Sequence, residues 1–186
     1  MTRPCRILAL LICAAVPPAT LAAERVVTLD PAASEVSFTL DTTFHVVHGT
    51  MALTGGTIRF NTETGMASGE ITVDALRAET GNEGRDKTMH AEVLETSRYP
   101  TIVFKPLRVE GTLVDPGRSE LKIVGVMSLH GEDHPMTLAA TVESAQGRVH
   151  GELRFPIPYV EWGMKDPSIF VIRAAKTVDI IVRAEG

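Results

Sequence analysis

Hydrophobic and polar residues alternate along most of the chain from residue 25 onward, which is the period of β-strands with one buried face. In Glu35–Leu40 the residues Val36, Phe38 and Leu40 share one face. Comparable segments lie at residues 43–47, 49–53, 57–60, 66–76, 101–109, 119–129, 136–142, 148–155 and 170–183. Turns separate them, one of them predicted at Gly55-Gly56. The pattern predicts a mainly β antiparallel sandwich or barrel. A barrel is favoured, because strands with one apolar face need a closed interior and no bare edge.

One stretch, from Gly81 to Phe104, does not alternate. Residues 85–94 have the spacing of about three helical turns, on which Met89, Val93 and Leu94 share one face. Tyr99-Pro100 ends any helix, because proline has no amide hydrogen and biases the residue before it to extended geometry. The sequence therefore predicts one short helical insertion whose apolar edge covers another part of the protein.

The first residues have the features of a secretory signal peptide. Arg3 and Arg6 precede an apolar run from Ile7 to Val16, and small residues suitable for cleavage follow Pro17-Pro18. The run is shorter than the roughly 20 residues that a membrane span requires. We therefore expect a cleaved signal peptide at residues 1–22, one domain at residues 23–186, export to the periplasm and no stable membrane insertion.

Cysteine content and charge narrow the classes of partner. Cys5 and Cys13 both lie in the predicted leader, so the exported domain would have neither disulfides nor thiolate metal sites. Removing Arg3 and Arg6 changes the balance of 18 basic and 23 acidic residues to 16 and 23, a net charge of −7. An acidic domain is a poor candidate for binding nucleic acid or an anionic membrane surface. A homodimer is left open.

Candidate catalytic groups are few. The chain has no Gly-x-Ser-x-Gly elbow, and Ser128 near His130 has no evident third partner. No glycine-rich phosphate loop precedes a helix. The sequence therefore predicts a protein that is not an enzyme and uses no cofactor.

The six histidines all fall in the predicted domain, and they carry the main alternative. His45 and His48 would face opposite sides of a strand, whereas His130 and His134 flank a short loop. None of these spacings is a zinc signature, so turn and hydrogen-bonding roles are favoured. The alternative is a metal-binding or redox- or stress-accessory barrel, which requires the histidines to converge in space.

Two interpretations apply to Arg85 and Asp86. They are either a cap and surface ion pair at the start of the helix, or part of a cavity mouth at which Arg85 faces an anionic or polar head group. We also place His90 at this mouth. An apolar tunnel is expected inside the barrel, because the apolar phase of each strand must point inward. Its candidate lining residues are Phe38, Phe60, Ile71, Val73, Met89, Ile102, Phe104, Met127, Leu129, Leu138, Phe155 and Trp162.

Motifs in order along the chain resemble those of the YceI-like proteins, an exported polyisoprenoid-binding family with a lipocalin-like barrel. The resemblance covers essentially the whole predicted domain. The motifs are Ser34–Phe38, the His45–Gly49 region, Thr80-Gly81-Asn82 with Arg85-Asp86 and Met89-His90, Tyr99–Phe104, Gly125–Gly131, and Tyr159–Met164.

This resemblance implies an elongated eight-stranded antiparallel barrel whose interior holds a long isoprenoid or other lipid chain, without a cofactor or a reaction. The sequence departs from the family pattern at His134, at Trp162–Ser168 and in the His45/His48 pair. Those departures would fit a subfamily with a different, metal-linked role. The expected function is a periplasmic lipid-binding barrel with a carrier or storage role.

Overall fold

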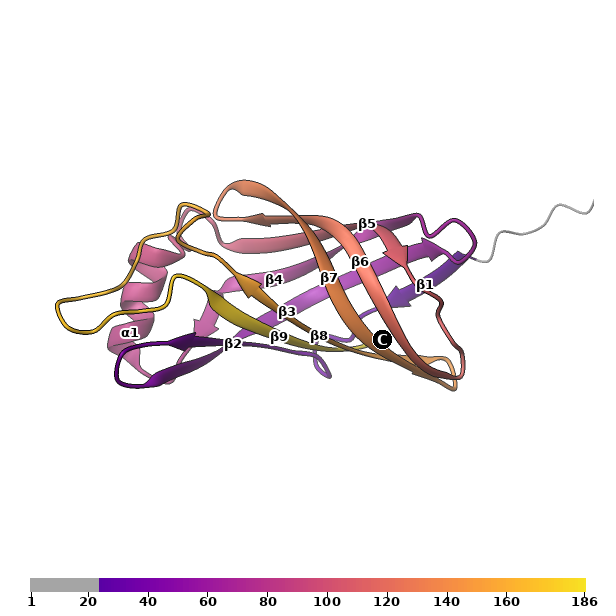
Figure 1. Ribbon diagram of the computed structural model, residues 1–186, viewed down its shortest axis with the longest axis horizontal. Helices are drawn as coiled ribbons and strands as arrows, with labels where there is room; N and C mark the ends of the chain where they lie inside the picture. The colour runs from indigo at the N-terminus through magenta and orange to yellow at the C-terminus, as the bar shows by residue number, and fades with distance from the viewer. Residues whose placement is uncertain (1–23) are drawn as a thin grey trace, which may run out of the picture.

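The computed structural model describes residues 24–186, so the predicted signal peptide at residues 1–22 lies outside the described residues. Antiparallel strands form a single sheet that winds into an elongated barrel (Figure 1). The strands are β1 (Glu24–Thr28), β2 (Glu35–Asp41), β3 (Val46–Asn61), β4 (Ala67–Glu79), β5 (Thr101–Glu110), β6 (Gly117–Leu129), β7 (Glu132–Ala145), β8 (Arg148–Ile157) and β9 (Val178–Glu185).

The barrel closes through eight of these strands. Their order is β3-β2-β9-β8-β7-β6-β5-β4, and pairing between β3 and β4 joins the two ends. Strand β1 is additional: it pairs with residues 57–61 of β3, whereas β2 pairs with residues 46–51 of the same strand. The expected eight-stranded antiparallel barrel is therefore confirmed, with β1 as an extra strand. Closure leaves no long unpaired edge within the barrel wall.

The expected helical insertion connects β4 to β5 at one end of the barrel (Figure 1). It consists of α1 (Glu83–Thr88) and a wider π-helical turn, η1 (Met89–Val93). The side chain of Asn82 caps the start by accepting a hydrogen bond from the Arg85 amide at 3.0 Å. The helix therefore begins two residues before the predicted position, and the cap explains why.

Two expected boundaries are wrong. Gly55-Gly56 is not a turn but lies inside β3, where the pairing with β4 shifts register next to Gly55. Glycine inside a strand pattern often marks such a bulge, which bends a long strand around a barrel. The segment 170–183 is not one strand: β9 begins only at Val178, and residues 158–177 form a loop at the same end as α1 (Figure 1).

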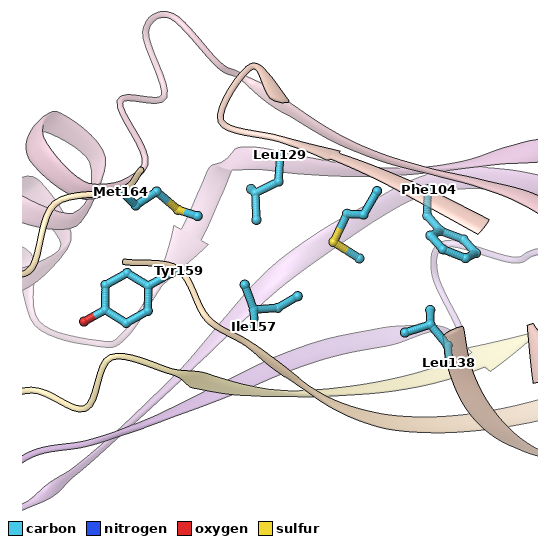
Figure 2. Close-up of a cluster of buried hydrophobic side chains, with 7 residues drawn as sticks. Phe104, Leu129, Leu138, Ile157, Tyr159 and Met164 are labelled. Carbon is cyan, nitrogen blue, oxygen red and sulfur yellow. The ribbon is translucent and has the colours of Figure 1, made fainter. Parts of the chain in front are cut away.

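The interior is apolar along its length but is not filled evenly. One cluster of buried side chains, including Phe60, Val109 and Leu121, packs the end farther from the helix. A second cluster contains Phe104 and Leu138 in mid-barrel and extends to Tyr159 and Met164 near the helix (Figure 2). Between residues 24 and 186, no helix is long and apolar enough to cross a membrane.

Candidate functional site

The barrel contains a cavity of about 420 Å³ at its helix end. Ligand pockets in proteins commonly measure about 300–1,000 Å³, so the volume suffices for a small or chain-like molecule. The lining comes from the inner faces of β2 to β6, β8 and β9, from the apolar edge of α1 and η1, and from the loop at residues 158–177. Met89, Val93 and Leu94 all line it, so the predicted apolar edge of the helix covers the cavity.

Several residues predicted to line a tunnel do border this cavity. Their side chains lie on inward-facing positions of five strands and of the helix. These residues are Phe38, Val73, Met89, Ile102, Met127, Leu129 and Phe155. That they contact a ligand remains a prediction.

Five predicted lining residues lie elsewhere, and their placement is a correction. Phe104 and Leu138 are buried in the barrel farther from the helix and do not border the cavity (Figure 2). Phe60 belongs to the cluster at the other end of the barrel, and Ile71 packs between two core clusters. Trp162 lies in the loop after β8. Inward phase along a strand gives the direction of a side chain but not its depth, so the four strand residues pack as core.

The polar groups of the lining gather at the helix end. They are Thr42 and His45 from the turn between β2 and β3, Thr80 directly after β4, and Arg85 and Thr88 from α1. Both segments lie at the same end of the barrel in Figure 1. The cavity therefore has a long apolar part and one polar end.

Arg85 is held at this polar end by Thr80. Its Nε donates to Oγ1 of Thr80 at 2.7 Å, and its Nη2 donates to the Thr80 carbonyl at 2.9 Å. None of the ion pairs found between residues 24 and 186 involves Arg85. A half-buried guanidinium without a carboxylate partner can still attract an anionic group.

Asp86 and His90 do not line the cavity, although the sequence placed them at its mouth. Asp86 accepts hydrogen bonds from both the amide and the hydroxyl of Thr80. Thr80 therefore joins Arg85 to Asp86, and the two charged residues do not pair directly. His90 hydrogen-bonds the Ala78 carbonyl at 2.9 Å and the Thr96 hydroxyl at 3.2 Å. Both residues fasten the helical insertion to its flanking segments.

Tyr159 is a lining residue that strand periodicity could not reveal, because it follows β8 in a loop. Its hydroxyl donates to the Ala175 carbonyl at 2.8 Å and ties together two parts of the loop. Burial, with a smaller contribution from the Asp166 carboxylate, raises the pKa of Tyr159 to about 12. Asp166 itself accepts hydrogen bonds from Lys176 and Ser168, which lower its pKa to about 2.

The histidines are dispersed. His45 borders the cavity, whereas His48 contacts the Thr39 hydroxyl on the exposed surface, as expected for opposite faces. His150 pairs with Glu185 at 2.7 Å. Nε2 of His130 lies 2.8 Å from a Glu95 oxygen, without the alignment of a hydrogen bond. In the part of the chain that the structure describes, no three histidine, cysteine, aspartate or glutamate side chains are grouped to hold a metal ion.

Two departures from the expected family pattern contact each other. The rings of His134 and Trp162 are stacked, with centroids 3.8 Å apart and an interplanar angle of 4°. His134 is paired in register with the cavity-lining Met127, so it lies on the inner face of β7. Trp162 thus anchors the loop on the β6–β7 hairpin.

Ser128, in the same hairpin, donates a hydrogen bond to Asp133, so it does not form a nucleophile–base pair with His130.

Fold and cavity define the chain as a closed β-barrel with an apolar internal site, polar at one end. The chain belongs to the YceI-like family, whose domain matches residues 27–186. A UPF0312 protein of Vibrio cholerae is 28% identical over 118 residues, which is 62% of this chain and 60% of the relative. The match thus spans less than two thirds of the relative's length.

Solved structures share the fold at low sequence identity. A polyisoprenoid-binding domain from Saccharophagus degradans, implicated in plant cell wall breakdown, has a TM-score of 0.69 and 16% identity, covering 85% of this chain and 95% of that domain. BcnA of Burkholderia cenocepacia has a TM-score of 0.70 and 14% identity, covering 85% and 99%. At these identities the likeness establishes the barrel fold.

Proposed function

We propose that the protein binds one long isoprenoid or other lipid chain in the barrel and serves as its carrier or store. The observation that carries this proposal is the cavity: about 420 Å³, apolar along most of its wall, with its polar groups confined to one end. Such a site suits a molecule with an apolar chain and a small head, because the chain is removed from water and the head keeps polar contacts. The polyisoprenoid-binding structural relative supports the same ligand class.

The polar end gives the ligand a direction. The head group lies next to Arg85, His45 and the threonines, and the apolar chain extends toward Phe38, Met127 and Ile180. If the ligand instead placed a hydrocarbon end against Arg85, the remaining guanidinium nitrogen would be covered without a hydrogen-bond partner, which is costly. An anionic or strongly polar head is therefore favoured over a hydrocarbon end.

Export is part of the same proposal. A periplasmic location is supported by the leader with Arg3 and Arg6, by the apolar run that follows them, and by the absence of cysteine after residue 22. In the periplasm a lipid chain needs a protein carrier to cross water. The mode of binding requires no reaction, and we propose no catalytic role.

The test combines recovery of the natural ligand with a blocked cavity. The protein is purified from its own host, measured by native mass spectrometry, and its extracted lipids are identified. We expect a bound lipid in the unmodified protein and loss of most of it in Ile102→Trp, which adds a large ring to the cavity wall. Leu107→Trp on the same strand is the matched control, because Leu107 is an exposed residue outside the lining.

The proposal fails if the unmodified protein carries no lipid and takes up neither farnesol nor farnesyl phosphate from solution. It also fails if Ile102→Trp and Leu107→Trp retain equal amounts of ligand while both remain folded by circular dichroism.

A further inference from the structure

The end of the barrel with the polar cavity groups also bears an exposed apolar surface. Phe44, Val46, Ile169, Phe170 and Val171, which we call the tip patch, expose 48 to 93% of their surface. They make up half of the large hydrophobic residues that are exposed between residues 24 and 186. Clustered exposed apolar side chains mark interaction sites, whereas isolated ones need no explanation.

Two segments distant in sequence are joined to build the tip patch. Thr43 donates its amide to the Arg173 carbonyl at 2.9 Å, and its hydroxyl accepts from the Arg173 amide at 2.9 Å. A further bridge pairs Thr42 with Ala174. In Figure 1 the turn between β2 and β3 and the loop at residues 158–177 lie together, and the loop extends beyond α1. The apolar side chains are therefore presented by a fixed support at the extremity of the barrel.

The tip of the loop is a two-residue hairpin closed by reciprocal hydrogen bonds between Ile169 and Ile172. Its first central residue is Phe170, with φ +42° and 93% of its surface exposed. Positive φ in such a turn favours glycine or asparagine, and a bulky side chain is unfavourable there. Neither the turn nor the core accounts for phenylalanine at this position, so we infer that its ring contacts a surface outside the chain.

The tip patch is continuous with the cavity. Ile169 and Ile172, which flank the turn, both line the cavity, whereas Phe170 and Val171 between them face solvent. Beside the turn, Arg173 is exposed and takes part in none of the ion pairs of the described chain. The other two cations of the loop are paired, Lys165 with Glu92 and Lys176 with Asp166, so Arg173 is the cation left free beside the patch. Apolar side chains with an adjacent free cation match a bilayer surface, which offers acyl chains below phosphate groups.

We propose that the tip patch inserts into the surface of a lipid bilayer, so that the cavity opens toward the membrane from which the ligand is collected or to which it is delivered. The inference rests on the proposed lipid function, because only a membrane-borne ligand requires this orientation. The insertion is shallow and reversible: a few side chains enter the interface, and the barrel remains outside. It differs from attraction of the whole acidic domain to an anionic surface, which the overall charge disfavours.

Flotation with vesicles of phosphatidylethanolamine and phosphatidylglycerol tests the proposal. The decisive variant is Phe170→Gly/Val171→Ser, which places glycine at the central position with positive φ, as in a type II′ hairpin, while removing two apolar side chains. We expect it to fold normally and to bind vesicles roughly tenfold or more weakly. The control is Met66→Ser/Val114→Ser, which removes two exposed apolar residues that follow β3 and β5 at the other end of the barrel (Figure 1). All proteins share the same N-terminus, so residues 1–23 contribute equally.

A second readout measures depth. In Phe170→Trp the new indole should be quenched by brominated acyl chains in the vesicles, whereas the unmodified protein should show little quenching of Trp162. Equal flotation of the tip variant, the control and the unmodified protein would overturn the proposal. So would a tip-dependent dimer seen by light scattering without any vesicle binding, because the patch would then join two copies of the chain.

The lipid content of each purified protein separates this inference from the proposed function. If the unmodified protein holds lipid but does not float, membrane docking is wrong and ligand binding stands. If it floats through the tip patch but never holds a lipid, the carrier function is wrong and docking stands.

Discussion

Arg85 donates from Nε to the Thr80 hydroxyl at 2.7 Å, and the same hydroxyl donates to the Asp86 carboxylate. One small side chain thus connects a cation and an anion that follow each other in sequence but do not contact. The arrangement leaves Arg85 turned toward the cavity, which it lines, and Asp86 turned away from it. Thr80 is therefore the residue on which the geometry of the polar end depends.

The first prediction concerns this hydroxyl. Thr80→Val keeps the shape of the side chain but removes the acceptor for Arg85 and the donor to Asp86, leaving two charged groups short of a partner. We expect a loss of about 1–3 kcal/mol in the free energy of unfolding, and faster hydrogen exchange in residues 83–93. Thr101→Val, an exposed threonine at the start of β5, is the control and should change stability little. Equal stability of the two variants in urea unfolding would contradict a central role for Thr80.

The second prediction concerns the charge of Arg85. Arg85→Gln retains hydrogen-bonding capacity toward Thr80 but removes the cation from the cavity. Hydrogen bonds to charged groups are about twice as strong as neutral ones, so affinity for farnesyl phosphate should fall roughly tenfold while affinity for farnesol changes little. Titration by fluorescence competition measures both. Lys87→Gln, on an exposed position of the same helix, should alter neither affinity. A parallel loss for both ligands would mean that Arg85 acts through the fold and not through a head group.

The sequence predicts those site residues whose positions follow the period of a strand or a helix. Alternation identifies Phe38, Met127 and Leu129 as inward-facing, and helical spacing identifies the face of Met89. Depth is not encoded in that period. Phe104 has the same phase as Ile102, yet it belongs to a buried cluster with Leu138 and does not border the cavity.

The loop residues escape prediction for a different reason. Tyr159 is held at the cavity by its hydrogen bond to Ala175, and Ile172 directly precedes Arg173, which is hydrogen-bonded to Thr43 in the turn between β2 and β3. Such contacts have no period along the chain. The family motif includes Thr80 but does not predict its role, because a hydroxyl that bridges two charged residues is recognised only from their positions in space. The fold is therefore more predictable than the site.

The third prediction concerns the contact between Gly49 and Phe38. The two residues are paired across β2 and β3, and the Phe38 ring covers Gly49 so closely that an added Cβ would lie 2.2 Å from Cζ. The Glu79 carbonyl, 2.6 Å from the same position, blocks the other side. Gly49→Ala must therefore displace a ring that lines the cavity, at a cost of about 1–3 kcal/mol, and should also lower ligand capacity.

Gly151→Ala is the matched control, because the nearest atom to its added Cβ is the Ala184 carbonyl oxygen at 4.0 Å. Its stability should stay unchanged or rise by up to about 1 kcal/mol, through reduced entropy of the unfolded chain. Chemical denaturation of both variants measures the difference. If Gly49→Ala were as stable as Gly151→Ala, the ring of Phe38 would be free to move and the close packing would have no energetic meaning.

The last prediction concerns the alkaline limit of the fold. Burial raises the pKa of Tyr159 to about 12 from its ordinary value of 10.0. The folded protein thus favours the neutral phenol, and this contribution to stability is fully present below pH 10 and is lost as the pH rises through about 12. Tyr159→Phe cannot ionise at this position. It should be less stable than the unmodified protein near neutral pH by about 1 kcal/mol, because the Ala175 carbonyl loses its donor. Between pH 10 and 12 the unmodified protein should lose stability faster than Tyr159→Phe, so the stabilities of the two proteins converge.

Absorbance titration should show one tyrosinate step near pH 12 that Tyr159→Phe lacks. A step that survives the substitution would assign the high pKa to another residue, and curves that stay parallel would show that Tyr159 ionises as readily in the folded chain as in the unfolded one.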